Sequence, residues 1–265
     1  MASRVPFLLA GLLVAVAVFG PLLPLADPMA TNVAAALRPP GLAHPFGTDH
    51  LGRDQLARVM MAARLDLGLA AAAVALAAVC GTVVGALAGW FGGWTDHVSG
   101  WVGDLLLAMP IYLLAMVLVG ALGNGLAIVV LATAVVNLPF FLRLVRGGVA
   151  RYRRALWVDA ARMSGQRDRD ILFRHVLPRV FPLVVVQATT NLGWAMLNAA
   201  GLSFIGVGVR PPSPEWGVMI AEGMRFLMGG HWWLVVFPGA ALAVSVLVFH
   251  LAGDAWRDLL AREAA

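Results

Sequence analysis

Long apolar runs separated by short polar segments are the feature that most constrains this chain. Six runs can be traced, at approximately 6–26, 67–90, 102–122, 126–144, 180–205 and 231–251. Each is close to the roughly 20 residues that an α-helix needs to cross a bilayer, whose core admits only helices and closed barrels. Charged residues make up 12% of the chain, against about 25% in soluble domains. The sequence therefore predicts an all-α integral membrane protein with about six transmembrane helices.

Arginine carries all of the basic side-chain charge, because the chain contains no lysine. About ten of the 19 arginines crowd the segment around and between the fourth and fifth runs: Arg143, Arg146, Arg151, Arg153, Arg154, Arg162, Arg167, Arg169, Arg174 and Arg179. The positive-inside rule predicts that this segment is cytoplasmic, and counting spans from it places both termini in the cytoplasm. Topology and contact with anionic lipid explain these arginines better than nucleic acid does.

The residue types that are missing exclude several kinds of chemistry. A P-loop needs a lysine to reach the nucleotide phosphates, so any ATP must bind to another subunit. The single cysteine, Cys80, excludes an internal disulfide and a cysteine-cluster metal site. No two histidines show the i, i+4 spacing of a helical metal site, so no metal is expected. Ser203 and His250 are expected near opposite faces of a core about 30 Å thick, too far apart to act as nucleophile and base. The chain is therefore not expected to be an enzyme.

The arginine-rich segment carries an ordered pattern of small residues. Asp159, Ala160 and Ala161 are followed by Gly165, and Leu177-Pro178 lies further on. Gly165 is typical of the C′ position after a short helix, and Pro178 either ends a second helical piece or begins the next helix. Charges in lipid cost about 2.5–3.5 kcal/mol each, so the segment must lie in water or against another protein.

This stretch resembles the EAA loop of ABC-importer permeases, Glu-Ala-Ala-x3-Gly-x9-Ile-x-Leu-Pro. Asp159 stands in place of the Glu and His175 in place of the Ile. The residues that fit the pattern are Ala160, Ala161, Gly165, Leu177 and Pro178. The resemblance implies a coupling helix that docks into a groove on a separate ATPase subunit. The alternative is a basic loop that only satisfies topology.

Three further strings resemble the same family. Residues 47–54 are similar to its Gly-Thr-Asp-x-x-Gly-Arg-Asp string, and residues 253–258 to its Gly-Asp-x-x-Arg-Asp tail. The most specific match is to Leu-Ser-Phe-Leu-Gly-Leu-Gly-x-x-Pro-Pro-x-Pro-Glu-Trp-Gly, and it is carried by Ser203, Gly206, Gly208, Pro211, Pro212, Glu215 and Trp216. This turn-rich string is expected to form an external loop, and the alternative to a specific role is a rigid loop folded back on the surface.

Taken together, the chain resembles an inner-membrane permease subunit of the oligopeptide, dipeptide and nickel ABC importers, with a type I transmembrane domain. The resemblance implies a bacterial cell membrane, a second homologous permease, two cytoplasmic ATPases that hold ATP and Mg²⁺, and an external solute-binding protein. No cofactor is expected in this chain. The expected substrate is a di- or oligopeptide, with nickel or a metal chelate as the alternative. A secondary, ion-coupled transporter is the alternative of another class, but it would need acids buried in mid-span, and none is expected there.

The resemblance also divides the chain. Residues 1–65 are expected to hold a first transmembrane helix and an external segment, 66–254 the type I transmembrane core, and 255–265 a short cytoplasmic tail. A cleaved signal peptide behind Arg4 is the alternative for the first helix. The external segment is expected to contain an amphipathic helix, with Asp49 as its N-cap, that lies on the membrane surface.

Two small sets of residues inside the spans are singled out by their spacing. Gln187, Asn191, Trp194 and Asn198 share one helix face, which either lines a translocation path or makes hydrogen bonds between helices. Gly81, Gly85 and Gly89 recur at every fourth position and predict close helix packing, unless glycine is simply common in membrane helices.

The link between the second and third runs carries aromatic and acidic residues. Trp90, Trp94 and Trp101 are predicted to be anchors at the membrane interface. Asp96 and Asp104 are expected to pair with neighbouring arginines. The third run contains Pro110 but is expected to form one span.

Overall fold

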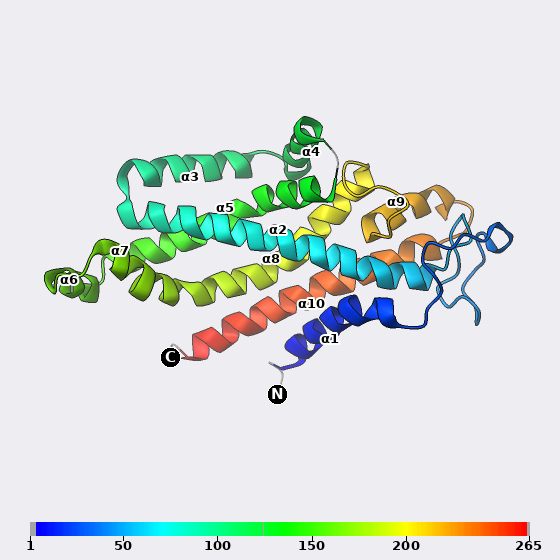
Figure 1. Ribbon diagram of the computed structural model, residues 1–265, viewed down its shortest axis with the longest axis horizontal. Coiled ribbons are helices and arrows are strands. Elements are labelled where there is room, and N and C mark those ends of the chain that lie inside the picture. Colours follow the sequence, from blue (N-terminus) through cyan, green and yellow to red (C-terminus); the bar gives the residue numbers. More distant parts are fainter. Residues whose placement is uncertain (1–3, 124, 264–265) are drawn as a thin grey trace.

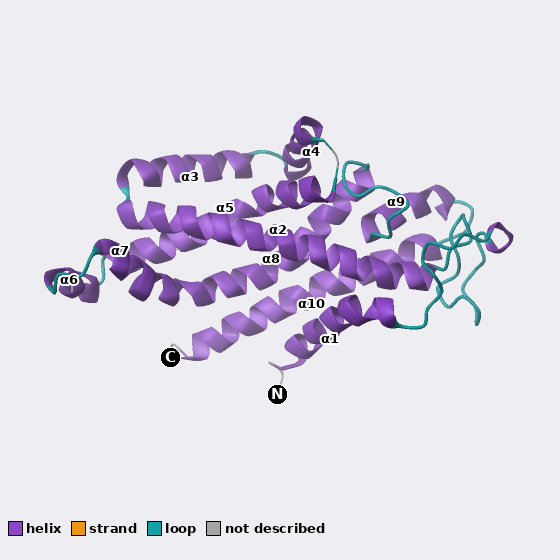
Figure 2. Cartoon of the chain, in the orientation of Figure 1, coloured by secondary structure: helices purple, strands orange, loops and turns teal. Residues whose placement is uncertain are grey.

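The structure is a computed structural model that describes residues 4–123 and 125–263. Residues 1–3, 124, 264 and 265, the last two in the predicted tail, lie outside it. Within the described residues all regular elements are helices, apart from one isolated β-bridge between Thr48 and Asp54 (Figures 1 and 2). The all-α prediction is therefore confirmed.

Long helices run side by side along the length of the molecule (Figure 1). Four segments are long and apolar enough to cross a membrane: α2 (Gln55–Phe91), α5 (Leu126–Arg153), α8 (Leu177–Ile205) with the short helices before it, and α10 (Trp233–Glu263). The bent pair α3 (Gly93–Ala108) and α4 (Ile111–Leu122) makes a fifth if it is counted as one span. The apolar α1 (Val5–Phe19) is shorter and packs on α10 and α2.

The predicted surface helix and the second span form one continuous helix, α2. Its N-cap is Asp54, whose Oδ1 accepts the Ala57 N–H at 2.9 Å. The prediction of Asp49 as N-cap was wrong, because its carboxylate instead accepts the N–H groups of Leu51 and Arg53. The prediction of a helix on the membrane surface was also wrong, since the first turns of α2 are buried inside the protein. The division proposed after residue 65 falls within this helix.

The third run is broken rather than a single span. α3 and α4 meet at an angle of 100°, and Pro110 is the N-cap residue of α4. Proline lacks an N–H for the helix ladder and forces the residue before it out of the α conformation. Met109 accordingly has ψ 137°, which ends α3. The predicted span through Pro110 is therefore broken at the proline, and it remains one span only if the bent pair is counted together.

The most extensive helix contact is that of α2 with α5, and it runs through the three regularly spaced glycines. A Cβ at Gly81 would lie 2.6 Å from the Phe141 Cβ, and one at Gly85 would lie 2.6 Å from the Leu142 carbonyl oxygen. A Cβ at Gly89 would lie 2.5 Å from the Arg146 carbonyl oxygen. Only glycine allows two backbones to approach this closely.

The two ends of the molecule differ in structure. One end carries α6 (Leu156–Met163) and α7 (Asp168–Ile171), which project beyond the long helices (Figure 1). The other carries α9 (Trp216–Leu227) and the loop of residues 20–54, with the 3₁₀ turns η2 (Gly20–Leu22) and η3 (Val33–Ala35). We refer to these as the α6 end and the α9 end.

Candidate coupling and translocation sites

At the α6 end, a short helix presents an exposed apolar face. Leu156 and Met163 are seven residues apart, so they lie on the same face of α6, and they are 87% and 84% exposed. Asp159 and Ala160 lie between them on this face and are exposed as well. The opposite side carries Val158, which is fully buried. Large apolar side chains this exposed on a projecting helix are typical of a surface that contacts a partner.

The turn after α6 depends on a glycine in the left-handed backbone conformation. Gly165 has φ +81°, the left-handed conformation of a C′ residue. Its N–H donates to the Arg162 carbonyl at 2.9 Å, and the Gln166 N–H donates to the Ala161 carbonyl at 3.1 Å. These two bonds form a Schellman motif, which fixes the end of α6 and the direction of the chain into α7. Ala161 is half-buried on the inner side of α6, against the core.

Arg162 joins α6 to the rest of the protein. Its Nε pairs with Asp168 at 2.9 Å, its Nη1 with Asp159 at 3.4 Å, and its guanidinium lies over the Trp90 ring at 5.3 Å. Trp90 is 2% exposed, so the prediction that it anchors the chain at the membrane interface was wrong. Sequence reasoning missed these contacts, of which only the i, i+3 spacing of Asp159 and Arg162 was visible in advance.

The second helical piece continues without a break into the next span. α7 leads into a π-helical segment, η4 (Leu172–Val176), and then into α8. Pro178 stands in the first turn of α8, so it begins a helix rather than ending one. Leu177 and Pro178 line a hollow of about 390 Å³ together with Phe173 and Phe181, beside Thr82 of α2. Ile171, Leu172 and Val176 are buried beneath it and hold this end of α8 in the core.

We call the face of α8 that carries Gln187, Asn191, Trp194 and Asn198 the polar stripe, and it is divided between the interior and the surface. Asn191 and Asn198 are buried, Gln187 is half-buried, and Trp194 is 50% exposed with its edge toward His250. Gln187 Nε2 donates to Asn191 Oδ1 at 2.8 Å, along the helix rather than between helices. Asn191 Nδ2 is buried and has no hydrogen-bond partner among the described residues. Such a donor needs water or another polar group.

At the α9 end, the turn-rich string ties together three helices. Ser203, in the last turn of α8, accepts the Val209 N–H on its Oγ at 3.0 Å. Gly206 has φ +91° and ends α8, and a Cβ at Gly208 would collide with Ser203. Pro211 and Pro212 lie in the turn that follows. Glu215 caps α9 by accepting the Val218 N–H at 2.7 Å.

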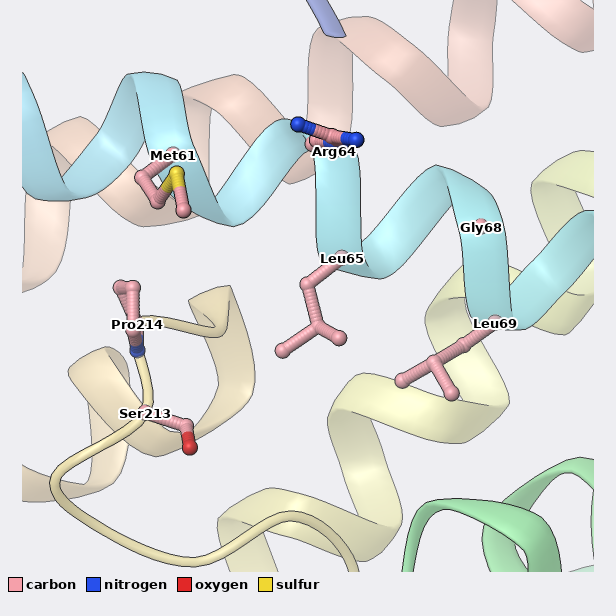
Figure 3. A pocket seen from close by; sticks show the side chains of 7 residues that line it. All are labelled: Met61, Arg64, Leu65, Gly68, Leu69, Ser213 and Pro214. Carbon is pink, nitrogen blue, oxygen red and sulfur yellow. The ribbon is translucent and has the colours of Figure 1, made fainter. Parts of the chain in front are cut away.

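The start of α9 is in turn bound to α2. The Trp216 backbone N–H donates to Asp66 Oδ2 at 3.1 Å, and the Trp216 indole donates to the Val59 carbonyl at 3.1 Å. Asp66, one residue before the predicted start of the second span, is 4% exposed and lies in the first third of α2 rather than in mid-span. Figure 3 shows the hollow beside this contact, of about 420 Å³, with Leu65 and Leu69 of α2 facing Ser213 and Pro214 of the loop.

A buried ionic cluster holds the loop of residues 20–54 against α2 and α9. Arg53 pairs with Asp49, and the guanidinium groups of Arg53 and Arg58 lie 3.6 Å and 3.8 Å from Glu222. Both arginines are at most 2% exposed. Buried charges are tolerated only when they are paired, and here the string at residues 47–54 supplies Asp49 and Arg53 to the cluster. This string is therefore part of the structural frame of the α9 end.

Ion pairs also join α3 to α5. Asp96 pairs with Arg146 through both carboxylate oxygens, and Asp104 pairs with Arg143 at 2.6 Å. The expectation that these acids pair with neighbouring arginines is confirmed. Trp94 and Trp101 of α3 remain 81% and 66% exposed, as their predicted place at a membrane interface requires.

These observations define a helical, multi-pass membrane protein. A helix with an exposed apolar face projects at one end, and a loop held by buried ion pairs lies at the other. A model of the family described as "Binding-protein-dependent transport system inner membrane component" matches residues 81–265. The chain belongs to this family, and it is a multi-pass inner-membrane permease component of an ABC transporter rather than an enzyme.

Curated relatives agree with this assignment. The chain is 40% identical, over 92% of its length and 80% of the relative, to the dipeptide transport system permease protein DppC of Alkalihalophilus pseudofirmus. It is 39% identical, over 92% of its length and 81% of the relative, to the probable D,D-dipeptide transport system permease protein DdpC of Escherichia coli. It is 41% identical, over 83% of its length and 73% of the relative, to the glutathione transport system permease protein GsiD of Escherichia coli.

Proposed function

We propose that this chain is one of two permease subunits of an ATP-driven importer of dipeptides or other short peptides. Support for the peptide comes from the relatives, which are named for dipeptide, D,D-dipeptide, glutathione or peptide transport. None of these relatives is named for nickel, and the nickel alternative is not retained. Support for the coupling role comes from one observation above all: the exposed apolar face of α6, braced from behind by Arg162.

The proposed complex contains this chain, a second homologous permease, two ATPases and a solute-binding protein. The α6 end faces the cytoplasm, where the ATPases lie, and the α9 end faces the binding protein. Both termini are cytoplasmic in this arrangement. We keep the proposed division into residues 1–65, the type I core 66–254 and the tail 255–265, with α2 shared by the first two parts.

The proposed mechanism is alternating access. ATP binding brings the two ATPases together, and each docked α6 moves with its ATPase. Because α6 continues through α7 and η4 into α8, the movement reaches the helix that carries the polar stripe. A ligand shifts such an equilibrium only through different affinities for the two states, so the loaded binding protein must prefer the outward-facing one.

The test is to capture the complex on this chain in its native form and to reconstitute it in proteoliposomes. The expected result is a second permease and two ATPases in the complex, with dipeptide uptake that requires both ATP and the binding protein. Recovery of the chain alone, or as a homo-oligomer without ATPases, would contradict the proposal. Uptake of nickel instead of peptide would keep the architecture and change the substrate.

The polar stripe gives a prediction about the path. If Asn198 contributes to the path, Asn198→Leu should slow uptake by about tenfold, since a lost hydrogen bond of about 1–1.5 kcal/mol corresponds to that factor. Association with the ATPases should not change, because Asn198 lies near the C-terminal end of α8, whereas α6 precedes the N-terminal end of that helix. The measurement is initial uptake rate against the amount of co-purified ATPase. Loss of ATPase from the complex would instead assign Asn198 to helix packing.

A further inference from the structure

The ionic cluster at the α9 end contains hydrogen-bond donors that its own carboxylates do not reach. Arg53 Nη2 and Arg58 Nη2 are buried, and neither has a hydrogen-bond partner among the described residues. Glu222 Oε2 lies 3.6 Å from the first and 3.8 Å from the second. These distances suit an ion pair but are too long for a hydrogen bond. A buried donor of this kind needs water or another polar group as its partner.

The other nitrogens of the two guanidinium groups are already engaged. Arg53 Nε donates to Asp49 Oδ2, and Arg58 Nη1 donates to the Pro28 carbonyl at 3.3 Å. Because a guanidinium group is planar and rigid, turning it toward Glu222 would break the hydrogen bond that it already makes. The gap between the arginines and Glu222 is therefore fixed by the loop of residues 20–54.

A small cavity is lined by both Arg58 and Glu222. The loop of residues 20–54 contributes Asp49 to its wall, α2 contributes Gln55 and Arg58, and α9 contributes Met219 and Glu222. The cavity has a volume of about 10 Å³. By the same measure, about 10–15 Å³ is the least that holds one water molecule. The cavity therefore has room for a single water and for nothing larger.

The side chains around the cavity suit water better than an ion. Arginine only donates hydrogen bonds and an ionised carboxylate only accepts them, whereas water does both. A water in the cavity can accept from Arg58 Nη2 and donate to Glu222 and Asp49, which is the usual number of about three bonds for a buried water. The two arginines and the two carboxylates already balance each other in charge, so neither an anion nor a cation is required.

We propose that one buried water molecule bridges Arg58 to Glu222 and holds the second half of α9 against α2 and the loop. The first turn of α9 is fastened directly, through the Trp216 N–H and Asp66. Further along the helix, the guanidinium nitrogens stay 3.6 Å and 3.8 Å from Glu222, and the water supplies the hydrogen bonds that this gap excludes. This role does not depend on what is transported.

The test is X-ray radiolytic footprinting of the full-length chain in its transporter complex. Radiolysis converts water to hydroxyl radicals, so a buried methionine is oxidised only where a water molecule lies against it. Met219 is 3% exposed and lines the cavity, whereas Met196 of α8 is 1% exposed and lines none of the hollows described above. Mass spectrometry should show Met219 oxidised at a rate comparable to that of Met224, which is 44% exposed on the same helix, with Met196 at background. Oxidation of Met219 no faster than that of Met196 would overturn the proposal.

Two variants of one residue test whether the water reaches α9. Leucine cannot accept a hydrogen bond, so in Glu222→Leu the water loses its partner on α9, and the oxidation of Met219 should fall to the level of Met196. Glu222→Gln is the matched control, because its amide oxygen still accepts from water and the oxidation should stay at the wild-type rate. Wild-type oxidation in Glu222→Leu would show that the water does not bridge to α9. If the leucine variant misfolds, which faster oxidation of Met196 would reveal, the wild-type comparison of Met219 with Met196 still decides the proposal.

Discussion

Replacing Met163 by glutamate is expected to reduce ATP-driven uptake by roughly 100-fold or more while leaving membrane insertion intact. Met163 is 84% exposed at the tip of α6 and contacts little of its own chain. Burial of a methionine side chain at an interface contributes about 1.5–3 kcal/mol. A buried, unpaired carboxylate adds a cost of several kcal/mol, and each 1.4 kcal/mol corresponds to about tenfold in affinity. The measurement is uptake together with the amount of ATPase that co-purifies.

The chain offers a matched control for this change. Met228 is 97% exposed at the α9 end, so Met228→Glu makes the same chemical change on the opposite end of the molecule. It should leave the co-purification of the ATPases unchanged. If Met163→Glu keeps normal uptake, or if both variants lose the ATPases equally, α6 is not the docking helix.

A backbone variant tests the same site without altering its exposed face. Gly165→Pro should also abolish uptake, since proline cannot adopt φ +81° and lacks the N–H that bonds to the Arg162 carbonyl. α6 would then lose its C-terminal cap and its fixed direction. Gly165→Ala is the milder comparison, because a Cβ at this position meets nothing within 4 Å and only the backbone angle is strained.

Replacing Gly85 by leucine is expected to prevent α2 and α5 from packing and to remove most of the folded protein. A Cβ at this position would lie 2.6 Å from the Leu142 carbonyl oxygen, a backbone atom that cannot rotate away. Overpacking costs typically 1–3 kcal/mol even where side chains can adjust, and more is expected against a backbone. The measurement is the yield and thermal stability of the detergent-purified chain.

Gly68 provides the matched control within the same helix. A Cβ there meets nothing within 4 Å, so Gly68→Leu changes the same residue type in α2 without a collision. It should give a yield and a melting temperature close to those of the wild-type protein. Equal losses in both variants would mean that leucine is harmful anywhere in α2 and that the glycine contact with α5 is not responsible.

The features that were predictable from the sequence are those that depend on neighbours along the chain. Apolar runs reveal spans because membrane thickness fixes their length. Gly165 could be placed at the end of α6 because its cap is made by residues within five positions. One such boundary was still predicted wrongly. The start of α2 and its apolar part were predicted as two helices, but no residue between them ends a helix, and they form one.

The features that were missed depend on residues far apart in sequence. Trp90 looks like an interface anchor at the end of a run, but Arg162, 72 positions later, covers its ring. Asp66 looks like a charge near the start of a span, and only the fold brings the first turn of α9, 150 positions away, against it. Pattern reasoning describes each helix by itself and gives no information on which charged group another helix will bring.

The length of α2 has a mechanical consequence. Its 37 residues make a rod of about 55 Å, at 1.5 Å per residue, without an internal proline. Near one end it holds α9 through Asp66, and at the other it carries the Trp90 ring that supports α6 through Arg162. A stiff rod acts as a lever, and a tilt of about 5° about one end displaces the other by about 5 Å. Because one helix links the two ends of the subunit, they cannot move independently. A displacement at either end is transmitted to the other through α2, without passing through a loop.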